Sequence, residues 1–368
     1  MTYTFHPHEV ALCGFSGSGK TTLCVKLIER LSKRFSVGYA KHSGHGFDID
    51  KPGKDTHLAH AAGASTVHIV STDQFAAYGT HATDYVAQRC LFSGNDMVLA
   101  EGWKSGAMPR IVMVADNDVA QTYLSEQTRK SGKILCWVTP TANVVIDDDR
   151  RAFARDDAAG LADFIASRFD ARTAQTPLYG LVLAGGQSSR MQSDKASLEY
   201  KGRSQLENAF DLLSDHCDPS FVSARDGQWS SSRFSHLAMI PDRYHNLGPM
   251  AGILSAMAEH PQAAWCVIAC DLPFLDSATL AHLIAERDPY KLATAYISAN
   301  DGLPEPLCAI YEPAAQSRLW QFISLGYRCP RKVLINSNTN VLTLQNKRAL
   351  ENVNHPDEYR AASLELKN

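Results

Sequence analysis

Short runs of apolar residues alternate with amphipathic segments along the whole chain. In the first half, apolar runs occupy residues 10–13, 97–100, 111–114 and 134–138. Runs of this length are typical of strands that are buried on both faces of a sheet. Apolar side chains also recur at helical spacing, at Leu23, Leu27 and Leu31 and again at Leu161, Phe164 and Ile165. The pattern predicts parallel strands joined by helices.

The alternation stops once and then resumes. Residues 171–177 are polar and end in Pro177, which is typical of a linker. Apolar runs follow at 178–184, near 221, near 239 and at 265–270, with helical patterns near 206–213, 250–257 and 280–285. At 368 residues, the chain is long enough for two domains that each bury a core. We therefore predict an α/β protein with a domain at 1–170, a linker at 171–177 and a second domain at 178–368. Each half is expected to contain a parallel sheet covered by helices on both faces.

The composition narrows the class of protein. The formal net charge is −3 and the chain has no basic run, so nucleic acid is not an expected partner. No apolar stretch approaches the length of a membrane span, about 18 residues, and the first residues lack the charged and apolar regions of an export signal. The nine cysteines lie mostly in apolar runs, as reduced core thiols would. We expect a cytoplasmic protein that does not bind membranes.

A first glycine-rich loop follows the apolar run at 10–13. It fits the P-loop pattern G-x-x-x-x-G-K-S/T, and an amphipathic helical segment follows, as the motif requires. Backbone N–H groups of such a loop turn toward the phosphates at a helix N-terminus, while the lysine neutralises β- and γ-phosphate oxygens and the hydroxyl can bind Mg²⁺. The alternative is a glycine-rich turn without a ligand. The predicted nucleotide-binding residues are Gly14, Gly17, Gly19, Lys20, Thr21 and Thr22.

A P-loop site also needs a carboxylate at the end of a neighbouring strand. Glu101 ends the apolar run at 97–100 and is the predicted acid on the metal side, with Thr21 as its partner, whereas Asp96 reads as a solvated strand start. The chain lacks an Asn-Lys-x-Asp element that would fix guanine, so the residues alone predict a purine nucleoside triphosphate without deciding its base. Residues 41–56 are polar, and their histidine spacings match no zinc template. Their lysines favour a loop that closes over an anionic ligand.

The first half resembles a known family. The P-loop, the stretch Lys-His-x-x-His-Gly-Phe-Asp-x-Asp-x-Pro-Gly-Lys-Asp at 41–55, and the segments 61–64 and 101–104 are similar to the GTP-binding accessory protein of molybdopterin-guanine dinucleotide synthesis. The resemblance covers most of residues 8–168 and implies a P-loop NTPase-like parallel sheet, GTP binding and weak GTP hydrolysis. One departure is Trp103, where the family usually has phenylalanine.

A second glycine-rich loop follows the apolar run at 178–184, and it is built differently. Leu-Ala-Gly-Gly-x-Ser-x-Arg-Met precedes Asp-Lys, a signature of nucleotidyltransferases. Gly185 and Gly186 let the backbone approach a triphosphate, and Arg190 and Lys195 supply cations for the charge that develops on a pyrophosphate leaving group. An unliganded turn with two surface cations is the alternative reading.

Two aspartates complete the second predicted site. Asp271 follows the buried run at 265–270 and precedes Pro273, so it lies at the carboxyl end of a central strand, where α/β folds bind ligands. We predict that Asp271 holds Mg²⁺; a structural aspartate or helix cap is the alternative. Asp242 ends another apolar run and precedes a glycine- and proline-rich loop, so it is expected to contact the nucleotide or the metal unless it is a solvated turn residue.

The second half resembles molybdenum cofactor guanylyltransferase over nearly all of residues 178–362. Further matching segments are 248–252, 306–311, 331–334 and 352–357. The resemblance implies a Rossmann-like nucleotidyltransferase domain in which Asp242 binds the nucleotide, Asp271 binds Mg²⁺ and Lys195 contacts phosphate. It also implies that the guanine nucleotide is bound by Leu183, Ala184 and Gly185. Two positions depart from the family: Gln192 stands in place of a glycine, and Ser223 stands where relatives often have asparagine near the ribose.

The implied reaction transfers GMP from GTP to molybdopterin or Mo-molybdopterin and releases pyrophosphate. Arg190, Lys195 and Asp271 are its predicted catalytic residues, and Arg331 and Lys332 are candidates for contacts with the anionic pterin. Molybdenum insertase and molybdoenzyme chaperones are candidate partners. Two other functions stay open: a nucleotidyltransferase for another substrate, such as a sugar phosphate with CTP or UTP, and a GTP-dependent adapter or cofactor carrier without turnover.

Overall fold

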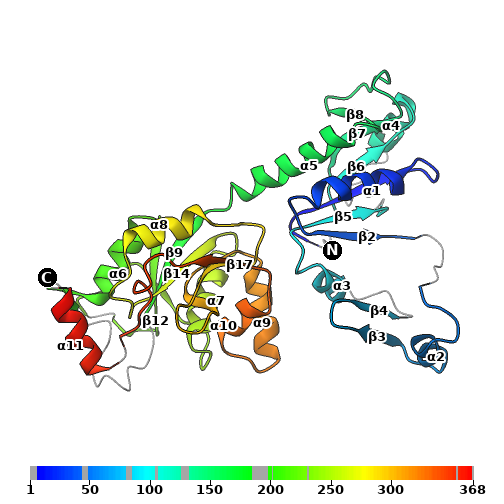
Figure 1. The fold of residues 1–368 in the computed structure, drawn as a ribbon. Helices are drawn as coiled ribbons and strands as arrows, with labels where there is room; N and C mark the ends of the chain where they lie inside the picture. The colour runs from blue at the N-terminus through cyan, green and yellow to red at the C-terminus, as the bar shows by residue number, and fades with distance from the viewer. Residues whose placement is uncertain are drawn as a thin grey trace. The chain divides into compact units, whose positions relative to one another are not determined.

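The computed structural model describes residues 6–43, 49–79, 85–103, 107–125, 132–184, 198–200, 202–229, 232–353 and 355–366. The chain divides into two compact units, Met1–Arg168 and Phe169–Asn368, which are described separately below (Figure 1). Within the described ranges, no helix is both long enough and apolar enough to cross a membrane.

The first unit is built on a six-stranded parallel sheet. Its strands run in the order β2-β5-β1-β6-β7-β8, and every neighbouring pair is parallel. In chain order they are β1 (Glu9–Gly14), β2 (Val37–Lys41), β5 (Met97–Glu101), β6 (Arg110–Met113), β7 (Ile134–Thr139) and β8 (Ala152–Ala154). The connecting helices are α1 (Lys20–Leu31), α3 (Tyr85–Leu91), α4 (Asn117–Ser125) and α5 (Ala158–Thr173). All residues of β1 and β5 are buried, which confirms the interpretation of the apolar runs at 10–13 and 97–100.

Three further elements of the first unit lie outside this sheet. They are α2 (Asp55–Ala61) and an antiparallel two-stranded ribbon of β3 (Thr66–Val70) and β4 (Phe75–Gly79). Most of their side chains are exposed, so they produce no buried apolar run. For this reason the sequence pattern did not predict them.

The segment between the predicted domains is partly helical. Helix α5 ends at Thr173, so residues 171–173 of the predicted linker belong to the helix and 174–177 connect it to the next strand. Phe169 is buried, and the Tyr290 hydroxyl donates a hydrogen bond to Asp170 Oδ1 at 2.8 Å. The hydrogen bond from Tyr290 stabilises the last helical turn, a tertiary effect that the polar composition of the segment could not indicate.

The second unit is built on a seven-stranded sheet in the order β13-β12-β9-β14-β16-β15-β17. Its strands are β9 (Leu178–Leu183), β12 (Ser220–Ala224), β13 (Met239–Pro241), β14 (Ala264–Ala269), β15 (Ala293–Ile297), β16 (Pro304–Tyr311) and β17 (Thr339–Thr343), and β10 (Glu199–Tyr200) and β11 (Arg203–Ser204) form a separate small pair. Strand β16 is antiparallel to both of its neighbours, so the expectation of a wholly parallel sheet is wrong here. The connection between β15 and β16 is short, and a short connection between neighbouring strands allows only an antiparallel pair.

Helices cover both faces of this sheet. They are α6 (Gln205–Ser214), α7 (Pro249–Glu259), α8 (Ser277–Ala285), α9 (Ala315–Ser324) and α10 (Pro330–Ile335), whereas α11 (Pro356–Glu365) packs in a separate small cluster with Tyr200 and Val353. Along β14, Cys266 and Ile268 pack into a core with α6 and α8, whereas Trp265 and Val267 pack into a core with α7, α9 and α10 (Figure 1). The two-sided burial confirms the predicted layers and places β9 and β14 at the centre of the sheet.

Candidate functional sites

The first candidate site is the loop between β1 and α1. Gly17 and Gly19 have φ angles of +75° and +86°, in the left-handed region that glycine adopts without strain. Gly19 is also the N-cap of α1. The loop therefore presents backbone N–H groups at the positive end of a helix, an arrangement that binds phosphate.

Lys20 is held against this loop. Its Nζ atom donates hydrogen bonds to the carbonyl oxygens of Gly14 and Phe15, at 3.2 and 2.5 Å, and to Ser18 Oγ at 3.4 Å. The ammonium group thus lies over the turn that the sequence pattern predicts to wrap a phosphate.

A polar cluster lies beside the start of α1, where β1, β2 and β5 end. Thr21 Oγ1 lies 2.9 and 3.0 Å from the two carboxylate oxygens of Glu101, to which its hydroxyl can donate. The Tyr39 hydroxyl donates to Glu101 Oε2 at 2.6 Å, and Lys41 Nζ lies 3.3 Å from both Glu101 Oε1 and Thr21 Oγ1. The structure therefore brings together Thr21 and Glu101, the two residues predicted to bind metal in this unit.

The cluster keeps Glu101 ionised. Burial raises the pKa of its carboxyl group, but the hydrogen bonds from Tyr39 and Thr21 and the ammonium of Lys41 outweigh it and leave the pKa below its ordinary value. Burial and the bond to Glu101 raise the pKa of the Tyr39 phenol, which stays a donor. A carboxylate and a hydroxyl suit Mg²⁺, which usually takes one or two protein oxygens and completes its shell with phosphates and water. Among the described residues, no group of three or more His, Cys, Asp or Glu side chains could hold a metal ion. A Mg²⁺ site of this kind does not need such a group, because phosphate and water oxygens supply the remaining ligands.

Two residues near this loop were missed by the sequence analysis. Tyr39 lies on β2, and only the pairing of β2 with β5 brings it to Glu101. Arg155 follows β8, and its Nη1 atom donates to the carbonyl oxygen of Ser18 at 3.3 Å. The interpretation of Asp96 as a solvated residue is wrong, because its buried carboxylate accepts a hydrogen bond from the Ser36 backbone N–H at 2.8 Å.

The second candidate site lies where β9, β12 and β14 end. The glycine-rich loop at 185–197, with Gly185, Gly186, Arg190 and Lys195, lies outside the described residues. The strand before the loop is described, and its neighbours β12 and β14 lie on opposite sides of it. The order of strands reverses between β9 and β14, and α/β sheets bind ligands in the crevice beyond such a reversal.

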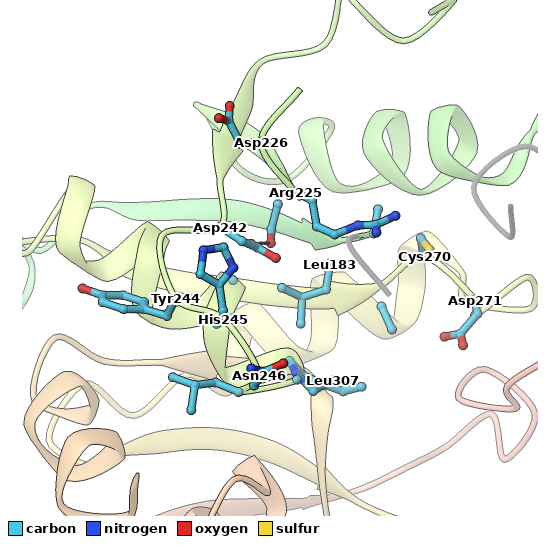
Figure 2. Close-up of a pocket in the computed structure, with 18 residues that line it drawn as sticks. Leu183, Arg225, Asp226, Asp242, Tyr244, His245, Asn246, Cys270, Asp271 and Leu307 are labelled. Carbon is cyan, nitrogen blue, oxygen red and sulfur yellow. Dashed lines mark hydrogen bonds between the residues drawn. The ribbon is translucent and has the colours of Figure 1, made fainter. Parts of the chain in front are cut away.

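A cleft of about 700 Å³ occupies this crevice. Asp242 and Asp271 both line it, and Figure 2 shows them on either side of Leu183. The structure thus brings together the described members of the predicted second site, Leu183, Ala184, Asp242 and Asp271. Residues of the cleft that the sequence analysis did not single out include Arg225, Tyr244 and His245.

Asp242 is fixed by its neighbours in the cleft. Its Oδ1 atom accepts a hydrogen bond from the Ser223 hydroxyl at 2.6 Å, and its backbone N–H donates to Ala224 at 2.8 Å. Burial raises the pKa of the Asp242 carboxyl, against the opposing effects of Ser223, Arg225 and His245. Ser223, which the sequence analysis left out of the site, therefore acts through Asp242. No sequence signal links these two residues, because the contact depends on the pairing of β12 with β13.

The start of α7 forms another wall of the cleft. Gly248 is its N-cap, with a φ of +56°, and Pro249 opens the helix. A Cβ atom at Gly252 would lie 2.2 Å from Ser223 Oγ and 2.7 Å from Leu183 Cδ2. Glycine at this position therefore lets α7 approach β9 and β12 closely and presents the helix N-terminus, which favours anions, to the cleft.

The two cations proposed to contact a pterin are engaged elsewhere. Arg331 forms ion pairs with Asp301 and Glu305, at 2.8 and 2.7 Å. Lys332 Nζ lies 4.7 Å from the centroid of the Tyr327 ring. These contacts give no support to a role of Arg331 or Lys332 in binding a second substrate.

Comparison with known proteins divides the chain in the same way. Residues 10–138 match the family described as molybdopterin guanine dinucleotide synthesis protein B, and residues 180–340 match the family described as MobA-like NTP transferase domain. The chain is 39% identical over 189 residues to the molybdenum cofactor biosynthesis bifunctional protein of Synechocystis sp., which covers 51% of this chain and 54% of that protein. The chain therefore spans about half the length of that relative.

Two shorter relatives each match one half. The molybdopterin-guanine dinucleotide biosynthesis adapter protein of Haemophilus influenzae is 32% identical over 162 residues, covering 42% of this chain and 86% of that protein. A probable molybdenum cofactor guanylyltransferase of Nostoc sp. is 30% identical over 188 residues, covering 49% of this chain and 88% of that protein.

Proposed function

The chain belongs to the family of molybdenum cofactor biosynthesis proteins, with a molybdopterin guanine dinucleotide synthesis protein B domain followed by a MobA-like NTP transferase domain, and from this premise we propose that it transfers GMP from GTP to molybdopterin. The products are the guanine dinucleotide form of the cofactor and pyrophosphate. The observation that carries the proposal is the cleft of the second unit, where Asp242 and Asp271 flank the end of β9 at the reversal of strand order.

The cleft offers distinct environments to the parts of a nucleotide. Asp242, held by Ser223, supplies a hydrogen-bond acceptor for the nucleoside, and the N-terminus of α7 favours an anion. The volume of about 700 Å³ falls within the range of small-molecule sites, about 300–1,000 Å³. Leu183 and Ala184 line the cleft at the point where the second glycine loop begins, and their backbone is proposed to contact the nucleotide.

The proposed chemistry is an in-line displacement at phosphorus. An oxygen of the terminal phosphate of molybdopterin forms a bond to the α-phosphorus of GTP, and the bond between that phosphorus and the oxygen bridging to the β-phosphate breaks. No general base is needed, because a phosphate monoester is ionised at neutral pH. Arg190 and Lys195 are proposed to stabilise the charge on the leaving pyrophosphate, so catalysis rests on positioning and electrostatics. Asp271 is proposed to hold Mg²⁺, which supplies positive charge to the phosphates when bound.

The first unit is proposed to be an accessory site that binds GTP and hydrolyses it slowly. The P-loop backbone and Lys20 would surround its phosphates, and the oxygens of Thr21 and Glu101 would hold Mg²⁺. A cytoplasmic location, and molybdenum insertase and molybdoenzyme chaperones as partners, are included in the proposal on the strength of the family alone.

A nucleotide-consumption assay tests the proposal. The full chain is supplied with GTP, CTP or UTP together with either molybdopterin or a sugar phosphate, and pyrophosphate release is measured. We expect release with GTP, and a loss of at least about a hundredfold in Asp271→Ala, because a lost metal site removes several kcal/mol of transition-state stabilisation. Asp215→Ala, an exposed substitution at the end of α6, serves as the control. Release with CTP or UTP and a sugar phosphate, or binding of GTP without any release, would favour the other transferase or the adapter.

A further inference from the structure

The P-loop site of the first unit already contains a cation of the protein itself. Lys41 ends β2 and is the direct neighbour of Glu101 in the register of the β2–β5 pair. Its Nζ atom lies 3.3 Å from Glu101 Oε1 and 3.3 Å from Thr21 Oγ1. These two oxygens are the ones that the proposed function assigns to Mg²⁺, so the ammonium of Lys41 lies where a metal would bind.

The two partners of this ion pair differ in freedom. The side chain of Glu101 is only 7% exposed, and hydrogen bonds from Tyr39 and Thr21 fix its oxygens. The side chain of Lys41 is 48% exposed, with a flexible stem. The buried carboxylate needs a positive partner, whereas the lysine can leave into solvent or toward another anion.

The second lysine of the site does not replace Lys41. Lys20 directs its ammonium to the carbonyl oxygens of Gly14 and Phe15. The described ion pair of Glu101 is the one that it forms with Lys41, whose Nζ atom lies 3.3 Å from Glu101 Oε1. Two cations on one carboxylate repel each other, so Lys41 and Mg²⁺ compete for Glu101.

We infer that Lys41 is a resident cation that excludes Mg²⁺ from the P-loop site until a nucleotide binds, so that metal and nucleotide bind together. The phosphates of the nucleotide add negative charge, which gives Lys41 another partner and gives the metal further oxygen ligands. By linkage, the factor by which nucleotide tightens metal binding equals the factor by which metal tightens nucleotide binding. The inference deepens the proposed function of the first unit and rests on it.

Metal titration tests this inference. The full chain carries Asp271→Asn to silence the second metal site, and Mn²⁺ binding is followed from the loss of its free-ion electron paramagnetic resonance signal, with and without GTP. We expect Lys41→Met to bind Mn²⁺ without nucleotide about tenfold more tightly than the parent, because the competing charge is gone. The tightening produced by GTP should shrink by a similar factor. Lys33→Met is the matched control, since Lys33 is exposed just beyond the C-terminal end of α1, away from the P-loop, and its substitution should leave both values unchanged.

The outcomes separate the inference from its premise. The role of Lys41 would be overturned if Lys41→Met still binds GTP but, without nucleotide, binds Mn²⁺ no more tightly than the parent. If the parent binds no Mn²⁺ even with GTP, the proposed nucleotide site of the first unit fails as well. Lys41→Gln provides a second neutral variant should Lys41→Met unfold, and Lys41→Arg, which keeps the charge, should behave like the parent.

Discussion

Glu101 is buried and Asp242 is half-buried, and both carboxyl groups lie at the ends of strands, but their pKa values shift in opposite directions. Glu101 receives hydrogen bonds from Tyr39 and Thr21 and an ion pair from Lys41, which outweigh burial and lower its pKa. Asp242 accepts one side-chain hydrogen bond, from Ser223, and burial raises its pKa. Glu101 is therefore a fixed anion that suits a cation, whereas the negative charge of Asp242 lowers the free energy of unfolding.

This difference predicts the effect of Asp242→Asn on stability. A carboxyl whose pKa is raised by folding binds more protons in the folded state, so the stability of the wild type falls as the pH rises through that raised value. The neutral amide avoids this cost. We expect Asp242→Asn to raise the free energy of unfolding at pH 7 and to raise it less at pH 4, measured by urea unfolding, while weakening GTP binding in the second unit. An equal gain at both pH values would mean that the charge of Asp242 is not the cause.

At the residue scale, the sequence identifies the residues whose role depends on their neighbours in the chain. Lys20 and Thr21 follow from the P-loop pattern, and Glu101 and Asp271 follow from their positions just after apolar runs. Tyr39, Lys41 and Ser223 reach their partners across paired strands. Contacts of this kind depend on the register of the sheet, which the pattern of one strand cannot reveal.

At the element scale, α7 shows how a helix is fitted to the cleft. Gly252 faces Ser223 and Leu183, where no side chain fits without a shift of its neighbours. The helix can therefore pack against β9 and β12 with its N-terminus at the cleft. Gly252 therefore influences both the position of α7 and the Ser223–Asp242 hydrogen bond, because it packs against Ser223.

Gly252→Ala tests this packing. The added methyl group would lie 2.2 Å from Ser223 Oγ, so overpacking should cost about 1–3 kcal/mol of unfolding free energy and should weaken GTP binding in the second unit. Gly94→Ala is the control, because a Cβ atom there has nothing within 4 Å and the φ angle of Gly94 is not in the left-handed region. A Gly252→Ala protein as stable as the control would show that α7 can move away without cost.

The sequence predicted those strands whose side chains are buried on both faces of a sheet. Strands β1, β5 and β14 are entirely buried and appear as apolar runs. The ribbon of β3 and β4 leaves side chains such as Ile69, Val70 and Phe75 more than half exposed, and no alternation marks it. The antiparallel direction of β16 depends on its short connection to β15 and not on the composition of the strand.

At the scale of the whole molecule, one chain contains two differently built sites, each proposed to bind a nucleotide. The first is a P-loop at the end of β1, and the second is a cleft at the reversal of strand order between β9 and β14. The sequence predicted two domains with different loops because each loop follows its own apolar strand. It could not predict the helical residues 171–173, which follow Asp170, the acceptor of a hydrogen bond from the Tyr290 hydroxyl.

The chemistry of GMP transfer is proposed to take place in the second unit alone. The most direct test supplies the full chain with molybdopterin and GTP labelled in its α-phosphate, and measures label in the dinucleotide product. We predict that Asp271→Ala loses incorporation by at least about a hundredfold, while Lys20→Ala, at saturating GTP, incorporates label at the wild-type rate. Loss of incorporation in Lys20→Ala, or full incorporation in Asp271→Ala, would contradict the account.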